Sequence, residues 1–407
     1  MFKKFGQKLV LWVDYRFPLI SLYKEHMSEY HTPKNFNFWY FFGSLAIAVL
    51  LLQILSGIWL TMSYSPDSLG AFDSVEYIMR DVSFGWFLRY LHSTGASFFF
   101  LVVYLHMFRA FLYGSYRKPR ELIWLLGMLI YLCLMAEAFF GYLLPWGNMS
   151  FWGAQVITSL FGAVPYVGGF LMEIIRGDYI VSGVTLNRFF SLHVTAIPIL
   201  LLGLVTLHVI ALHEVGSNNP DGIEIKESKD YYGVPIDSLP FHPYFTVKDL
   251  FGLGVFLIFF FSVLFFAPDF FGYFLEAPNF TPADPLATPA HIAPVWYMTP
   301  YYAILRAIPN KLLGVIAMGL AIAVLFFLPW LDRSKVKSIR YKGPLSKIIL
   351  CVFVVSFLGL GYFGMSAPSP LYTLLSQICS VFYFSFFLFM PIYSRFDTTF
   401  EVPKRLT

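Results

Sequence analysis

Runs of apolar residues long enough to cross a lipid bilayer recur along the 407-residue chain. A transmembrane helix needs about 20 such residues, because each residue advances it by ~1.5 Å through the hydrocarbon core. Only 13% of the residues are charged, which is about half the share in soluble domains. We therefore predict an all-α integral membrane protein with eight transmembrane helices, at approximately 39–62, 85–112, 120–144, 184–212, 247–267, 311–331, 345–365 and 370–393.

Basic residues are concentrated in the segments on one side of these predicted spans. They precede the first span and recur at 117–120, 333–347 and 395–405. Because cytoplasmic loops carry the excess of Lys and Arg, we expect this side to be cytoplasmic, with both termini inside. The net charge of +4 follows from these short loops, so it gives no indication of nucleic-acid binding.

We expect three parts along the chain. Residues 1–38 form a cytoplasmic N-terminal amphipathic segment, without the apolar core and small residues of a cleavable signal peptide. Residues 39–215 form a four-helix bundle, and residues 216–407 form a C-terminal membrane domain of four helices. Their outer loops, 145–183 and 268–310, are rich in Pro, Gly and aromatic residues, so we expect folded surface there.

Four of the nine histidines lie within predicted spans, where an ionisable side chain is costly and usually functional. His92 and His106 are in the second span, and His193 and His208 are in the fourth. Because these spans run in the same direction, His92 can meet His193 (the outer histidine pair) and His106 can meet His208 (the inner histidine pair). Two such pairs predict two bis-imidazole haem sites. Hydrogen-bonded histidines at helix interfaces are the alternative, which explains one histidine better than four paired by depth.

The spacing of glycines supports this interpretation. The histidines of the second span are fourteen residues apart, which is ~21 Å along a helix and within ~40° of the same face. The same interval separates two glycines in the first span and two in the third. A glycine would leave room for a flat macrocycle at each level, although small residues also serve close helix packing. The four are Gly43, Gly57, Gly127 and Gly141.

The fourth span departs from this regularity. His193 and His208 are fifteen residues apart, and Pro198 lies between them. One extra residue turns the second imidazole away by ~60° in the other direction. We hypothesise a wide turn or bulge near Pro198 that absorbs the extra residue.

Cysteines and arginines bear on how a haem would be held. Cys133, Cys351 and Cys379 all fall within predicted spans, and the sequence has no CxxCH motif, so coordination alone must hold any haem. Three arginines stand near the ends of the histidine spans. They can neutralise haem propionates or simply extend to the membrane surface. These are Arg89, Arg109 and Arg188.

Several stretches together resemble cytochrome b of the cytochrome bc complexes, the ubiquinol–cytochrome c reductases, most closely of the proteobacterial type. They include PWGNMSFWGAQVIT, RFFSLH, LHEVGSNNPDGI, FHPYFTVKD, DPLATPAHIAPVWY and YYAILRAIPNK. The resemblance covers nearly the whole chain and implies a multi-pass protein of a bacterial inner membrane. It implies two non-covalent haem b groups, the outer one of low potential on His92 and His193 and the inner one of high potential on His106 and His208.

In this family a Pro-Glu-Trp-Tyr tetrad marks the quinol-oxidising site near the outer haem. This chain has Pro294, Val295, Trp296 and Tyr297, so it lacks the glutamate that usually accepts a quinol proton. We hypothesise that Glu276, on the same loop, takes over that role. The alternative is a surface carboxylate. By the same resemblance, Tyr142, Phe139, Gly153 and Ile157 match other positions of the pocket.

The resemblance also implies a quinone-reducing site near the inner haem. His213 and Ser217 follow the fourth span, and Lys248 and Asp249 lie near the start of the fifth. A histidine and an aspartate can bind the two quinone carbonyls and supply protons. The alternative is helix capping and solvated charge at two span ends.

The implied reaction divides the two electrons of ubiquinol between two routes. One leaves through an iron–sulfur (Rieske) protein and a c-type cytochrome, and the other crosses the membrane to reduce ubiquinone while protons are translocated. This sequence has no motif for those two carriers, so partner subunits in a homodimeric complex must hold them.

Two other functions remain open at this point. One is the dihaem cytochrome b that anchors a quinone-linked dehydrogenase, which typically has four or five spans and lacks the APVWY loop. The other is a proton-coupled transporter with buried histidines, for which we would expect broken helices and internal repeats.

Overall fold

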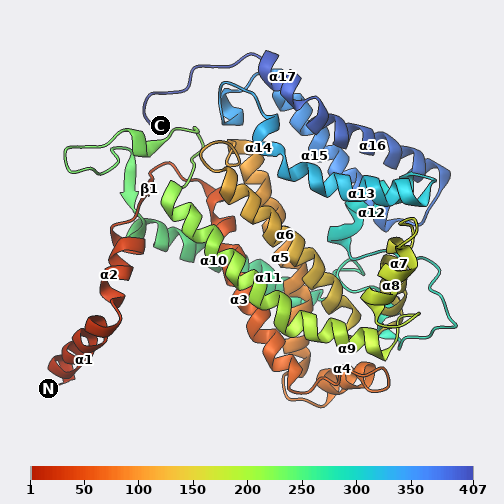
Figure 1. Ribbon diagram of the computed structural model, residues 1–407. Helices are drawn as coiled ribbons and strands as arrows, with labels where there is room; N and C mark the ends of the chain where they lie inside the picture. Colours follow the sequence, from red (N-terminus) through yellow and green to blue (C-terminus); the bar gives the residue numbers. More distant parts are fainter. Residues whose placement is uncertain (1, 407) are drawn as a thin grey trace.

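The computed structural model describes residues 2–406 and is almost entirely helical (Figure 1). Seven helices of this part are long and apolar enough to cross a membrane: Phe38–Thr61, Gly85–Tyr113, Glu121–Leu143, Gly183–Val215, Phe241–Phe266, Pro344–Met365 and Pro370–Leu388. They correspond to seven of the eight expected spans. The predicted class, an all-α integral membrane protein, is therefore confirmed.

The remaining expected span, the sixth in chain order at 311–331, is shorter than predicted. It consists of α13 (Lys311–Phe326) and the single turn α14 (Leu328–Leu331). Pro329 has no N–H to donate to the carbonyl of Leu325, four residues earlier, so the helix is interrupted there. The indole Nε1 of Trp124 donates to this carbonyl instead, at 2.7 Å. The count of eight full-length spans is thus not confirmed.

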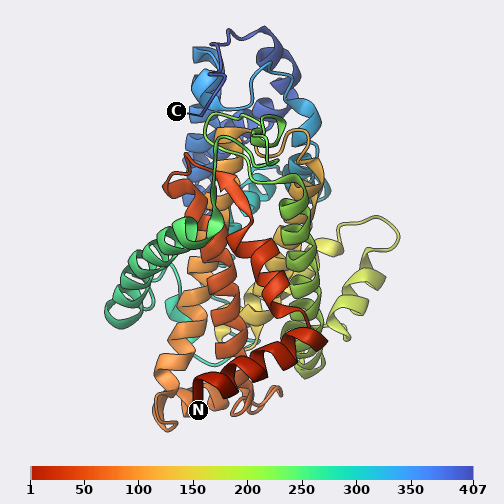
Figure 2. The ribbon, with the colours of Figure 1, turned by 90° about the vertical axis from the view of Figure 1, so that its left-hand side faces the viewer.

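The first half of the chain forms a bundle of four long helices. These are α3 (Phe41–Thr61), α5 (Gly85–Tyr113), α6 (Glu121–Leu143) and α10 (Ile197–Val215), the last preceded by α9 (Gly183–Ser191). Helix α3 packs on α5, and α6 packs on α10, so the helices run side by side (Figures 1 and 2). Their buried side chains are almost all apolar or aromatic, which is what holds such a bundle together at close range.

The fourth helix contains the predicted irregularity. Between α9 and α10 the chain makes one π-helical segment, η3 (Leu192–Ala196), which includes His193 and ends just before Pro198. A π turn holds one residue more than an α turn. The wide turn expected near Pro198 is therefore confirmed, and it takes up the extra residue between His193 and His208.

The second half packs against the bundle through aromatic side chains. Helix α11 (Thr246–Phe266) leans on α3 and α5, and the ring of Phe111 on α5 stacks on Phe353 at 5.6 Å. The remaining helices of this half are α12 (Thr299–Ala307), α15 (Pro344–Met365), α16 (Pro370–Leu388) and α17 (Met390–Phe396).

Shorter elements occupy the two ends of the bundle. The C-terminal segment and a two-stranded antiparallel sheet lie toward one end of the bundle. From this sheet α2 (Leu19–Tyr23) and α1 (Phe2–Arg16) lead away, so the N-terminal helix lies toward the opposite end (Figures 1 and 2). In this sheet β1 (His31–Pro33) pairs with β2 (Ser238–Pro240), with His31 opposite Pro240. The opposite end carries α4 (Ala71–Arg80), α7 (Asn148–Phe161) and α8 (Gly168–Arg176) (Figure 1).

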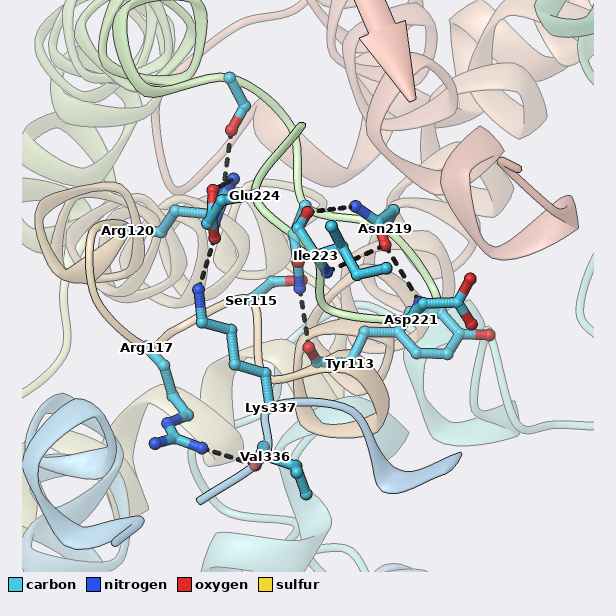
Figure 3. A network of polar contacts seen from close by, with 12 residues as sticks. Tyr113, Ser115, Arg117, Arg120, Asn219, Asp221, Ile223, Glu224, Val336 and Lys337 are labelled. Atoms are coloured by element: carbon cyan, nitrogen blue, oxygen red, sulfur yellow. Dashed lines mark hydrogen bonds and ion pairs between the residues drawn. The ribbon is translucent and has the colours of Figure 1, made fainter. Parts of the chain in front are cut away.

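A polar clamp closes the bundle at the end that carries the two-stranded sheet (Figure 3). The buried guanidinium of Arg120, after α5, donates to both oxygens of Glu224 at 2.6 and 2.8 Å and to the carbonyl of Gly216 at 2.9 Å. Lys337, from the second half of the chain, binds the same carboxylate. Three segments far apart in the sequence are therefore fixed at the point where the histidine helices end.

Candidate haem and quinone sites

The structure brings the four histidines together as two pairs. The rings of His92 and His193 have centroids 6.1 Å apart with planes at 89°, and those of His106 and His208 are 6.4 Å apart at 60°. A metal bonded at about 2.0 Å to one nitrogen of each ring would place the centroids about 6 Å apart. Both pairs thus have the spacing that a shared metal ion requires.

Each predicted glycine faces one of these imidazoles. A Cβ added at Gly57, Gly43 or Gly127 would lie 3.2–3.4 Å from Cε1 of His92, His106 or His208, respectively. A Cβ at Gly141 would overlap with the ring of His193. The glycines were expected to make room for a macrocycle, and in this structure the room lies against the edges of the imidazoles.

Polar groups hold the rings of the outer pair, and the sequence analysis missed them. Nδ1 of His92 lies 3.0 Å from Oγ of Ser56. Nδ1 of His193 lies 2.9 Å from the carbonyl oxygen of Glu137 and 3.0 Å from its carboxylate. Since Nδ1 is engaged in both rings, Nε2 is the nitrogen left for a metal. An ionisable residue within a span, such as Glu137, was a signal that could have been used.

The three predicted arginines differ in where they lie. Arg89 lines a cavity together with His92. Arg109 has its guanidinium 4.9 Å from the ring centroid of Tyr40, and its buried Nε has no hydrogen-bond partner among residues 2–406. A guanidinium in the cavity beside His92 and a buried guanidinium Nε without a partner near His106 fit an anionic group such as a propionate.

Arg188 does not fit this expectation. Its side chain is exposed and donates to the carbonyl of Ile174 at 2.8 Å, and it is not among the residues that line the cavity. The turn at Gly177, where φ is +76°, folds the end of α8 back against its guanidinium. The side chain is therefore used to fasten a surface helix.

A cavity of about 400 Å³ lies against the outer histidine pair. Its wall includes both histidines together with Tyr142, Val295 and Tyr297. This volume is within the range of about 300–1,000 Å³ that is usual for small-molecule sites. The predicted outer haem site and the predicted quinol site therefore share one continuous space.

Glu276 lies directly behind the wall of this cavity. The hydroxyl of Tyr142 donates to Oε2 of Glu276 at 2.8 Å. Burial raises the pKa of Glu276 to about 7, although the hydrogen bond from Tyr142 opposes this shift. Gly153 lies next to the same tyrosine, because a Cβ there would be 3.7 Å from its ring. A carboxyl group whose pKa is raised toward neutral pH is thus one hydrogen bond from the cavity.

The segment 294–297 is fixed firmly in the wall. The ring of Tyr297 stacks on Phe100 with centroids 3.8 Å apart, and the hydroxyl of Tyr104 donates to its carbonyl oxygen. The indole of Trp296 donates to Ser97 at 3.2 Å. Val295, which stands where the family's glutamate was expected, is buried. Phe139 packs at 5.3 Å from Phe189 as part of the surrounding core.

The residues predicted for the inner quinone site form two groups. The ring of His213 stacks on His26 at 5.2 Å, and the ring of Tyr30 lies 4.5 Å from it. Asp249 lines a separate cavity of about 150 Å³ together with Phe241.

Tyr30 and Phe241, whose rings are 6.4 Å apart, stand between these two groups. Ser217 lies beside the phenol of Tyr30, and the ammonium group of Lys248 is 5.2 Å from the ring of Phe245. His26 and Tyr30, from the N-terminal segment, were not predicted.

Histidine pairs at two depths of a membrane-spanning bundle, each matched by glycines, define a b-type membrane cytochrome. Comparison with protein families agrees with this class. The family described as cytochrome b/b6/petB matches residues 27–216, and the family described as cytochrome b (C-terminal)/b6/petD matches residues 282–384. The chain belongs to the cytochrome b family.

Known relatives match over almost the whole length. Cytochrome b of Allochromatium vinosum is 61% identical, with 97% of each chain covered. A cytochrome b/c1 of Bradyrhizobium diazoefficiens is 47% identical over 97% of this chain and 56% of that protein. A solved structure titled hyperthermophilic respiratory complex III has a TM-score of 0.88 at 40% identity, covering 95% of this chain and 98% of that one.

The expected resemblance is thereby confirmed. The chain is an integral membrane protein of the electron-transport chain, and its family binds haem b. Cytochrome b is the core catalytic subunit of ubiquinol–cytochrome c reductase, which works with partner subunits. The dehydrogenase anchor and the transporter are not supported, because family, length and fold all agree with cytochrome b.

Proposed function

We propose that this chain binds two non-covalent haem b groups, oxidises ubiquinol at the cavity beside the outer histidine pair and reduces ubiquinone near the inner pair. One observation carries the proposal: two histidine pairs have metal-binding spacing, and one of them shares its cavity with Tyr142 and Tyr297. The two pairs are separated by fourteen residues of α5, or ~21 Å. Transfer of an electron over this distance spans much of the hydrocarbon core, which is about 30 Å thick.

The chain's own residues have distinct tasks at the haem sites. His92 and His193 would hold the outer iron and His106 and His208 the inner one, with Arg89 and Arg109 placed to neutralise propionates. When bound, haem supplies one-electron redox chemistry at these two depths. The glycines keep the imidazoles close to the opposing helices, so the iron ligands remain in register.

At the outer site, two electrons and two protons must leave ubiquinol. We assign one of the protons to the path from the cavity through the hydroxyl of Tyr142 to the carboxylate of Glu276, at 2.8 Å. A base with a pKa of about 7 is well matched to this task. Tyr297, Pro294, Trp296 and Gly153 shape the pocket. Glu276 thus replaces the glutamate that is absent at Val295.

At the inner site, we assign the uptake of protons to His213 and Asp249. The stacked rings of His26 and His213 and the cavity at Asp249 lie on two sides of Tyr30 and Phe241. A quinone ring inserted between these aromatic groups would bring both polar side chains to its carbonyls. Ser217 and Lys248 complete the polar surroundings.

The same proposal extends to partners and location. An iron–sulfur (Rieske) protein and a c-type cytochrome would receive the other electron. The relative named cytochrome b/c1 in B. diazoefficiens, of which this chain covers 56%, supports the second partner. We also propose a homodimeric complex in a bacterial inner membrane, with both termini cytoplasmic. The proposal also keeps the three expected parts of the chain: the N-terminal segment 1–38, the four-helix bundle 39–215 and the C-terminal membrane domain 216–407.

A reduced-minus-oxidised absorbance spectrum with a haem count tests the proposal. We expect two b-type haems for each chain, titrating at separate potentials, and quinol-dependent reduction of both. A count of one haem for each chain would contradict the two-site assignment. A protein without any haem would contradict the proposed function.

A further inference from the structure

Two residues of α6 contact the same outer imidazole. Glu137 and Gly141 are four residues apart, so they lie on one face of the helix. Gly141 makes room for the ring of His193, and Glu137 places its backbone carbonyl and its carboxylate 2.9 and 3.0 Å from Nδ1. One helical turn therefore provides both the space for this ligand and the acceptors for its N–H.

The carboxylate of Glu137 is placed where a charge is costly. Its side chain is only 18% exposed, and its Oε2 is buried without a hydrogen-bond partner among residues 2–406. Within residues 2–406, the one ion-pair partner of the Glu137 carboxylate is His193. Glu137 also lines the cavity shared with His92. A carboxylate inside a membrane span is usually functional, because desolvation opposes its presence there.

The inner level shows that this carboxylate is not needed to build a bis-histidine pair. Fourteen residues before Glu137, at the corresponding position of α6, the chain has Ile123, whose backbone faces His208. The inner rings nevertheless reach a similar spacing, 6.4 Å compared with 6.1 Å. The carboxylate therefore adds a property that only the outer site has.

We infer that Glu137 is a positioning residue that accepts a hydrogen bond from the Nδ1–H of His193, orients this imidazole as an iron ligand and lowers the reduction potential of the outer haem. The inference rests on the proposed binding of two haems. Metal-bound histidines commonly donate their second N–H to a carboxylate, which fixes the ring and makes it a more basic ligand. A more electron-rich ligand and a nearby negative charge both favour the oxidised iron.

The direction of electron flow follows from this placement. A carboxylate at the outer level lowers the potential there, whereas arginines stand beside histidines at both levels, Arg89 near His92 and Arg109 near His106. The carboxylate is therefore the charge that differs between the two levels, and it favours transfer of an electron from the outer haem to the inner haem.

Two substitutions in the purified, haem-loaded complex test the inference. Glu137→Gln keeps an acceptor oxygen but removes the charge, and Glu137→Leu removes both. Redox titration of the two b-type haems by absorbance, with EPR spectra of the oxidised protein, gives the readout. We expect the outer midpoint to rise in both variants, by a tenfold change in the outer-to-inner equilibrium, or about 59 mV for one electron. The outer EPR signal should shift, and the inner haem should be unchanged.

Glu173→Gln is the matched control. It removes an exposed carboxylate from α8, at the same end of the bundle, and should leave both midpoints unchanged. The inference is wrong if Glu137→Gln binds two haems with the wild-type outer midpoint and EPR signal. Loss of the outer haem in Glu137→Leu, with a raised midpoint in Glu137→Gln, would support it. Absence of haem from the wild-type complex would instead contradict the proposed function.

Discussion

The outer and inner histidine levels use the same four helices, at a fourteen-residue interval in three of them and a fifteen-residue interval in the one with the π turn. The levels differ in what touches Nδ1. At the outer level Ser56 contacts His92 and Glu137 contacts His193. Fourteen residues earlier in the chain these positions are Phe42 and Ile123. The histidines and glycines are repeated between levels, whereas the polar partners are not. Geometry therefore sets how many cofactors the bundle can hold, and the partners of the rings set how the two sites differ.

The largest expected effect comes from removing one ligand at each level. His92→Leu should lose the outer haem and His106→Leu the inner haem, so that each variant retains one haem out of two. A leucine cannot coordinate iron, but it preserves the apolar packing of α5. A pyridine haemochrome count and the midpoint of the remaining haem would check this. Loss of both haems from either variant would show that the two levels do not assemble independently.

A second test compares the proton-carrying carboxylates of the two quinone sites. Glu276→Gln should slow quinol oxidation about 100-fold, because a positioned base contributes at least that much. The carboxylate form of Glu276 increases as pH rises through about 7. The wild-type rate should therefore rise across this range, and the rate of the variant should not.

Asp249→Asn is the matched variant, since it alters the inner cavity alone. It should slow reoxidation of the inner haem by quinone and leave outer quinol oxidation intact. Stopped-flow reduction of the haems separates outer quinol oxidation from inner quinone reduction. The range is pH 5.5 to 8.5, about 1.5 units on either side of the pKa of Glu276. A normal pH profile in Glu276→Gln would refute its role as the base.

A third test compares the glycines. Gly141→Ala should weaken binding of the outer haem by about tenfold, because the new methyl group overlaps with His193 and overpacking costs about 1–3 kcal/mol. Gly43→Ala should be tolerated better, because its Cβ would meet His106 at 3.4 Å, an ordinary contact. Haem occupancy during a controlled haem titration measures both. Equal losses would mean that the close approach at Gly141 has no special importance.

The smallest expected effect is that of Ser56→Ala. Loss of the 3.0 Å contact with Nδ1 of His92 should cost about 1 kcal/mol, or about fivefold in retention of the outer haem. The matched substitution Phe42→Leu at the inner level should leave retention of the inner haem unchanged. Thermal release of each haem, followed by absorbance, would measure the difference.

Much of this arrangement could be predicted from the sequence, because helical periodicity converts residue intervals into depth and direction. The pairing of four histidines, the facing glycines and the wide turn before Pro198 follow from that geometry alone. Glu276 was expected near the outer pocket, but its hydrogen bond with Tyr142 joins residues 134 positions apart. Such a contact depends on how the second half packs, which no local pattern states.

Other features were missed or wrong for identifiable reasons. The break at Pro329 has a clear signal in the sequence, yet the apolar run around it suggested a continuous span. The side chain of Arg188 points toward the turn at Gly177. The position of an arginine near the end of a span does not show in which direction its side chain points. His26 meets His213 across 187 positions of the sequence, close to the pairing of β1 with β2, and no local pattern indicates such a contact.

The clamp of Arg120, Glu224 and Lys337 has a consequence for biosynthesis. Translation releases the chain from its N-terminus, and domains can begin to fold during synthesis. Arg120 and Glu224 are both made before Lys337, so their ion pair can close the bundle while the later helices are still on the ribosome. Lys337 then adds a second cation to a carboxylate already in place. The first half can thus complete its framework early, and the second half is assembled onto it.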